Sequence, residues 1–291
     1  MTLSRLRLLA IGMLSLAGSA MAQPDRAYTQ EDLQPVHWAF SSFFGTGWYQ
    51  IDNNRSVFVL RMPPRWTLRE SEYREDGRQS GLELHFPVTI GVHDIDDLPG
   101  IIEPDNFGTV SFTPGVEFEI PVTADWYLRP FVQAGYGFDL SSSEGAWIYM
   151  GGVKSRYRFD LDRADIDILT NVYYAGYNSN NSEDDDISGI LLGTEFTHRL
   201  GAAERGANRY SAKWHASYSR LSRKLNFIDP GEDTGFNSVD DFFTIGLAFT
   251  PPEGRWNFWL YKPWQLGLAL EFSPEGDYAA IKFNSRSWFT R

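Results

Sequence analysis

The chain has 291 residues and no cysteine, which excludes disulfide bonds, thiol chemistry and thiolate metal sites. Its formal net charge of −12 argues against a nucleic acid partner, because such partners require basic groups that neutralise phosphates. Aromatic residues make up 15% of the chain and charged residues 22%. This combination of many rings with an otherwise polar sequence favours a membrane β-barrel over a soluble domain, which would need a large core.

The first residues have the pattern of an export signal. Arg5 and Arg7 precede an apolar run, which ends in an A-x-A cleavage site at Ala22. We therefore expect a Sec-type signal peptide over residues 1–22, cleaved after Ala22. The alternative is an uncleaved anchor helix, which the small residues in the run and the cleavage site disfavour. No later segment has eighteen consecutive apolar residues, so no transmembrane helix is predicted after it.

Residues 23–44 form a lead segment without the alternation of a strand. Within it, Glu31–Phe44 has the pattern of a short amphipathic helix, and Pro35 suits the first turn of such a helix. Aromatic side chains gather towards its end, at Trp38, Phe40, Phe43 and Phe44. The sequence therefore predicts a short helix directly before the first strand.

From Gly45 onwards, apolar and polar residues alternate in segments separated by turn signals. Gly81–His93 is the clearest case, with apolar residues at every even position and polar residues or glycine at most odd positions. We predict twelve strands: Gly47–Ile51, Ser56–Leu68, Gly81–His93, Gly108–Val122, Trp126–Leu140, Ala146–Leu161, Ile166–Tyr177, Ser188–Leu200, Arg209–Ser222, Val239–Thr250, Trp264–Phe272 and Tyr278–Phe289.

The length of these strands separates a membrane barrel from a soluble sandwich or a lipocalin-like barrel. Many are about 12–16 residues long, which is enough to cross an apolar band of about 25 Å when tilted. Soluble strands are usually about five or six residues long. We therefore predict a transmembrane antiparallel up-and-down β-barrel over residues 45–291. We expect it in the bacterial outer membrane, in contact with outer-membrane lipids and lipopolysaccharide.

The polar side of the predicted strands carries charges in the middle of the strands, where a barrel has its lumen. Carboxylates and cations there can pair across neighbouring strands, and such pairs can close a barrel or line a pore. The residues predicted to line the lumen are Glu83, His85, Glu117, Glu119, Arg129, Lys154, Arg156, Glu195, Lys213 and Glu271.

The end of the chain, IKFNSRSWFTR, is a strand with a ring at Phe289, which is the feature that barrel-assembly machinery recognises in outer-membrane barrels. Together with the signal peptide, about twelve strands and the opening GTGWYQI after a helix-like lead, this SWF terminus resembles solitary outer-membrane autotransporter-like β-domains. These are barrels without a passenger. The resemblance covers about residues 30–291. It implies a non-enzymatic envelope protein or a narrow pore that residues 23–44 plug.

A lipid-modifying hydrolase is the competing class of function. His215 and Ser217 are two positions apart on one strand, as in outer-membrane phospholipase A and lipid A deacylases, where histidine is the base and serine the nucleophile. Those enzymes present the pair to the membrane. Here both residues share the lumen side with Lys213, so we expect ordinary polar lumen residues and no enzyme.

No metal site or cofactor is predicted. His85 and His93 would lie about 27 Å apart on one strand, too far to share an ion. The acidic segments Glu183–Asp186 and Glu232–Asp233 lack the spacing of a Ca²⁺ site and are expected to be solvated loops.

Overall fold

The computed structural model describes residues 37–50, 56–74, 77–93, 107–140, 142–161, 164–182, 184–200, 210–226, 238–251, 265–274 and 278–284. The predicted signal peptide, the lead before His37 and the C-terminal ring at Phe289 lie outside these residues. So do Glu183 and Glu232–Asp233. In the described part of the chain, no helix has both the length and the apolar character needed to cross a membrane.

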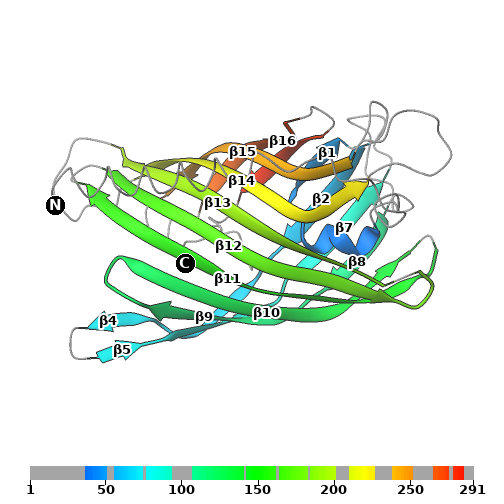
Figure 1. Ribbon diagram of the computed structural model, residues 1–291, viewed down its shortest axis with the longest axis horizontal. Helices are drawn as coiled ribbons and strands as arrows, with labels where there is room; N and C mark the ends of the chain where they lie inside the picture. The colour runs from blue at the N-terminus through cyan, green and yellow to red at the C-terminus, as the bar shows by residue number, and fades with distance from the viewer. Residues whose placement is uncertain are drawn as a thin grey trace. The chain divides into compact units, whose positions relative to one another are not determined.

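The described residues form a short helix followed by strands that run around a barrel wall (Figure 1). The elements are η2 (Trp38–Ser42), β1 (Gly47–Gln50), β2 (Ser56–Met62), β3 (Arg65–Arg69), β4 (Glu72–Arg74), β5 (Gly77–Gln79), β6 (Gly81–His85), β7 (Val88–His93), β8 (Phe107–Phe112), β9 (Gly115–Pro121), β10 (Trp126–Asp139), β11 (Gly145–Leu161), β12 (Ala164–Ser179), β13 (Asp185–Arg199), β14 (Ser211–Asn226), β15 (Ser238–Thr250), β16 (Leu266–Phe272) and β17 (Ala279–Asn284).

The sheet closes on itself through antiparallel pairs. From β10 to β17 each strand pairs with the next in sequence, β17 pairs with β1, and β1 pairs with β2. β2 continues to β7 and β8, and β8 returns to β10. β2 with β3, β6 with β7 and β8 with β9 are each one wall strand in two parts, so the described residues form twelve wall strands. This confirms the predicted fold class and the number of strands.

Prolines divide these three wall strands at the same level. The breaks fall at Pro63–Pro64, Phe86–Pro87 and Thr113–Pro114, although the sequence predicted each strand as unbroken. Proline has no N–H to donate and therefore interrupts a ladder of hydrogen bonds. Each broken strand still accepts a bond from its neighbour, namely Phe86 N–H to the Pro64 carbonyl (2.9 Å), Thr113 N–H to that of Pro87 (3.1 Å) and Ala134 N–H to that of Pro114 (3.0 Å).

Burial alternates along the wall strands, and the outward side is apolar. In β6 the odd-numbered residues are buried and the even-numbered ones are half-buried. Large apolar side chains cover the outer face, among them Val132, Val172, Leu192, Trp214, Ile245 and Leu268. A continuous apolar outer face on a closed barrel is the surface of a protein that spans a lipid bilayer.

The predicted helix over Glu31–Phe44 differs from the structure where the structure describes it. From His37 on, the helical part is a five-residue 3₁₀ helix, Trp38–Ser42. The ring of His37 accepts a hydrogen bond from the Ala39 N–H at 3.2 Å and caps it. Aromatic residues and serine favour an α-helix only weakly, so contacts with the barrel decide the conformation of this segment.

The polar connection after β3 contains a further hairpin. β4 and β5 pair with each other in a separate two-stranded sheet, which extends beyond the end of the barrel (Figure 1). The twelve strands predicted from the sequence do not include this hairpin. Charged and polar side chains dominate the hairpin, so its six strand residues lack the apolar alternation of the wall strands.

Candidate functional site: the barrel lumen

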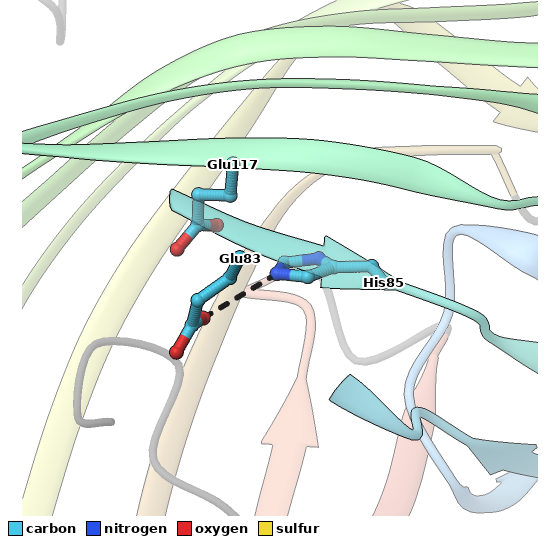
Figure 2. A group of neighbouring side chains, drawn as sticks. All are labelled: Glu83, His85 and Glu117. Atoms are coloured by element: carbon cyan, nitrogen blue, oxygen red, sulfur yellow. Dashed lines mark ion pairs between the residues drawn. The ribbon is translucent and has the colours of Figure 1, made fainter. Parts of the chain in front are cut away.

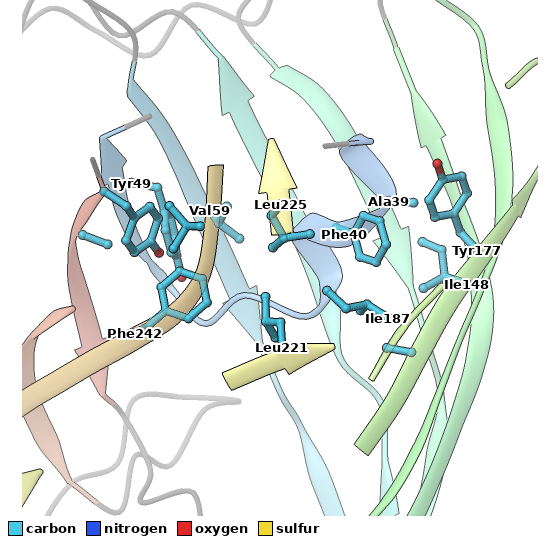
Figure 3. Close-up of a cluster of buried hydrophobic side chains, with 14 of the residues drawn as sticks. Ala39, Phe40, Tyr49, Val59, Ile148, Tyr177, Ile187, Leu221, Leu225 and Phe242 are labelled. Atoms are coloured by element: carbon cyan, nitrogen blue, oxygen red, sulfur yellow. The ribbon is translucent and has the colours of Figure 1, made fainter. Parts of the chain in front are cut away.

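The segment His37–Phe44, which we call the plug, packs inside the barrel. Its helix η2 contacts β7, β8, β11 and β12, and Phe40 is only 2% exposed. The ring of Phe40 meets that of Tyr177 edge to face at 5.3 Å. Apolar side chains from seven wall strands surround the plug and form what we call the apolar collar (Figure 3): Tyr49, Val59, Ile148, Tyr177, Ile187, Leu221, Leu225 and Phe242.

Glu144, in the connection between β10 and β11, fastens the plug at the barrel end. Its carboxylate accepts a hydrogen bond from Trp38 Nε1 at 3.2 Å and contacts His37 Nε2 at 3.3 Å. The hydroxyls of Ser179, the last residue of β12, and of Ser182, in the connection to β13, donate to the same carboxylate. One buried acid therefore joins the plug to the end of β12 and to the connection that follows it.

The ionisation of this pair follows from burial and hydrogen bonding. Burial opposes the ionisation of Glu144, but the hydrogen bonds that its carboxylate accepts outweigh it and lower the pKa to about 2. Burial lowers the pKa of His37 below its ordinary 6.5, and the Glu144 carboxylate opposes this shift only in part. At neutral pH, an ionised Glu144 therefore faces a neutral His37.

Further along the lumen, buried charges form a compact group. Glu83 on β6 lies directly opposite Glu117 on β9, and two carboxylates in this position repel each other. Arg129 on β10 compensates them, since its Nε lies 2.7 Å from Glu117 Oε1 and its Nη2 3.2 Å from Glu83 Oε2. Lys154 Nζ lies 2.6 Å from Glu117 Oε2. With Arg65 and Glu119, which pair with Glu83 and Arg129, these residues form what we call the charged band.

Other strands carry further inward ion pairs. Arg158 binds Asp167 with two bonds of 2.9 and 3.0 Å, and Arg156 Nε lies 3.9 Å from the same acid. Lys213 pairs with Glu195 at 3.0 Å, and Lys282 with Glu271 at 2.6 Å. Of the ten residues predicted to line the lumen, all face inward: eight are buried, and Glu119 and Arg156 are half-buried.

Three of these residues have the donor types of a metal site. The ligand atoms of Glu83, His85 and Glu117 all lie within 4.8 Å of one another (Figure 2). Both carboxylates already pair with the cations of the charged band. A divalent ion would have to displace these cations, which then would be buried without a counter-ion. The surroundings of this donor set therefore fit a metal ion poorly.

His215 and Ser217 are both half-buried and line the lumen on β14. The alternate residue Trp214 is exposed on the outer face. Neither His215 nor Ser217 has a side-chain hydrogen bond to another residue in the part of the chain that the structure describes. The pair is thus turned away from the surface where a lipid substrate would lie.

The lumen contains a cavity of about 250 Å³ next to the plug. Phe43 and Phe44 of the plug line it. Two acids line it, Glu195 and Glu271, which pair with Lys213 and Lys282. The basic and amide groups that line it are Arg61, Arg65, His85, Gln133, Lys154 and Asn171.

Neither Arg61 and Arg65 nor Glu144 was singled out from the sequence. The parity of the strand was the available signal for the two arginines. Nothing in the sequence near Glu144 indicates its hydrogen bonds, because His37 and Ser179 are distant along the chain.

The structure is similar to the crystal structure of the β-domain of the Bordetella autotransporter BrkA, with a TM-score of 0.43 and 13% sequence identity. The similarity covers 82% of this chain and 96% of that chain. No family model and no curated protein matches the sequence. A likeness at this TM-score supports no inference, so the barrel assignment comes from the strand pairing, and the resemblance to autotransporter-like β-domains stays a prediction.

Proposed function

We propose that this protein is a non-enzymatic barrel of the bacterial outer membrane whose lumen is a narrow channel obstructed by its own plug. The observation that carries the proposal is the burial of Phe40 within an apolar collar contributed by many wall strands. A side chain in this position lies in the lumen. A twelve-stranded barrel has room for only a narrow channel there, so the side chain obstructs it. The apolar outer face supports insertion in a membrane.

The test is single-channel conductance in planar bilayers, with the mature chain compared with a variant that lacks residues 23–42. We expect little conductance from the mature chain and clear openings from the shortened one, because the deletion removes η2 and leaves the strands. Phe40→Ala should give intermediate, flickering openings. Val132→Ala, a truncation on the outer face, is the matched control and should conduct like the mature chain. Absence of conductance from every form, in barrels that are folded by gel mobility, overturns the channel.

The non-enzymatic part of the proposal is supported by the inward direction of His215 and Ser217. Catalysis requires that the nucleophile reach the scissile bond, and a lumenal serine cannot reach an ester in the surrounding bilayer. Purified outer membranes with Ser217→Ala should hydrolyse phospholipid and lipid A at the same rate as those with the unchanged protein. A robust activity that disappears in the variant would establish the hydrolase instead.

A further inference from the structure

Arg61 on β2 is a cation for which the described residues provide no carboxylate within ion-pair distance. Its Nη2 donates one hydrogen bond, to Gln133 Oε1 at 3.3 Å. Its Nε is buried and has no hydrogen bond partner in the described structure. A guanidinium has five N–H donors, so most of the donors of Arg61 are left for another partner. The side chain lines the lumenal cavity.

Arg65 on β3 lines the same cavity and is only partly neutralised. It lies 3.5 Å from Glu83, but Arg129 approaches the same oxygen of that acid more closely, at 3.2 Å. The Nε of Arg65 is also buried without a hydrogen bond partner among the described residues. Arg65 and Arg129 therefore share the single carboxylate of Glu83.

The charges on this wall do not balance. The cations are Arg61, Arg65, Arg129 and Lys154, and the carboxylates that pair with them are Glu83, Glu117 and Glu119. Within this group four cations share three carboxylates, although the whole chain has a net charge of −12. Because a buried cation without a counter-ion is unfavourable, an anion that enters the cavity is stabilised there.

We propose that the lumenal cavity binds a small organic anion, and that Arg61 and Arg65 hold its carboxylate or phosphate group. A guanidinium offers parallel N–H donors that match the oxygens of either group, which an ammonium does not. Phe131, Met150 and Leu169 also line the cavity and provide an apolar surface for the body of the ligand. A volume of about 250 Å³ suits a compact molecule.

This site goes beyond the proposed channel, because binding does not require that the lumen conduct. The test is isothermal titration calorimetry on the folded barrel in detergent micelles, with benzoate and phenyl phosphate as probes. Benzyl alcohol, which is neutral, and benzylamine, which is a cation, are the matched controls. We expect saturable binding of at least one of the two anions and of neither control, and the tighter anion identifies the carboxylate or the phosphate as the preferred group.

Substitutions of Arg61 test whether the anion binds at this residue. Arg61→Gln should weaken anion binding at least tenfold, whereas Arg61→Lys, which keeps the charge, should weaken it less. Arg78→Gln, on the exposed β4–β5 hairpin, is the matched control and should bind as the unchanged protein does. Each titration is repeated without residues 23–42, so that a closed plug cannot hide the site.

Three results would overturn the site: no anion binding in either form, equal binding of benzyl alcohol, or unchanged binding by Arg61→Gln. Conductance measured on the same samples separates this proposal from the channel. Barrels that conduct but bind no anion contradict the site alone, and barrels that bind but never conduct contradict the channel alone.

Discussion

The apolar collar and the charged band share strand β11 and the wall strand formed by β2 and β3, yet they fill the lumen in different ways. On β11, Ile148 belongs to the collar and Lys154 to the band, six residues further along. On the wall strand formed by β2 and β3, Val59 belongs to the collar and Arg65 to the band. Both parts use inward positions of one continuous alternation. On these strands the inward residues are thus apolar beside the plug and charged further along.

The difference matters because the apolar collar and the charged band should respond differently to substitutions. Apolar packing around the plug depends on a segment that can leave without breaking the sheet. The ion pairs of the charged band cross from strand to strand, so they are part of the wall itself. We therefore expect changes in the band to affect the stability of the barrel, and changes in the collar to affect the state of the plug.

The largest expected effect comes from a substitution that removes a cation from the charged band. Arg129 is 2% exposed and compensates two facing carboxylates. Arg129→Met keeps much of the side-chain volume but leaves Glu83 and Glu117 repelling each other, so we expect a loss of about 3–5 kcal/mol in the free energy of unfolding. Urea unfolding in lipid bilayers, followed by tryptophan fluorescence, measures it.

Arg78→Met on the exposed hairpin is the control for Arg129→Met and should change the stability by less than about 0.5 kcal/mol. A loss below about 1 kcal/mol for Arg129→Met would show that the acids of the band become protonated or hydrated at little cost.

The strands were predictable because their signal is local. A period of two with turn residues between segments is sufficient to find twelve strands and to decide which side chains share a face. The proline breaks could have been found too, since Pro64, Pro87 and Pro114 each remove a ladder donor. Parity indicates that Glu117 and Arg129 both point inward, but not that they meet.

The contacts within the site depend on information that is not local. The pairing of Glu117 with Lys154 follows from the registers of β9, β10 and β11, which result from closure of the whole sheet. The role of Glu144 requires that the plug enter the barrel, and the loop around it has the composition of a solvated turn. Long-range geometry of this kind leaves no pattern in a single sequence.

The collar and the band both lie in the lumen. A substitution on the outer face tests whether that face lies in the bilayer. Val172 lies near the middle of β12 and is 56% exposed. Val172→Arg would place a charge in the centre of the bilayer and should reduce stability by about 2–4 kcal/mol. Leu161→Arg, at the end of β11, is the control and should cost about 0–1 kcal/mol. Equal costs at both positions would contradict the membrane placement of the barrel.

The next effect is smaller and acts on the collar. A Cβ at Gly137 on β10 would lie 2.9 Å from Cζ3 of Trp38 and 2.9 Å from Cβ of Ser111 on β8, closer than side chains normally approach. Gly137→Ala should therefore displace the plug and strain the pairing of β10 with β8, at a cost of about 1–3 kcal/mol, and raise conductance. Gly151→Ala, where the nearest atom is 3.5 Å away, is the control and should do neither.

The smallest expected effect is on pH dependence, and it acts on the fastening of the plug. The lowered pKa of His37 means that the seated plug favours the neutral ring, so protonation opposes seating as the pH falls below about 6.5. The lowered pKa of Glu144 means that its contribution is complete above 4.5 and is lost between 4.5 and about 2. Asp139 and Asp185 are the other acids that act on His37. They favour its protonated form and therefore reduce the weakening of the plug that protonation of His37 causes.

Both shifts weaken the fastening in acid, so channel openings should become more frequent as the pH falls, first modestly and then steeply below 4.5. Glu144→Gln keeps the shape but removes the charge that accepts these hydrogen bonds, at a cost on the order of 1 kcal/mol. It should open more often at neutral pH and lose the steep step, whereas Glu72→Gln on the exposed hairpin should keep it. If the steep rise in channel openings below pH 4.5 persists in Glu144→Gln, an acid other than Glu144 fastens the plug. The plug is then held in the collar without the Glu144 carboxylate.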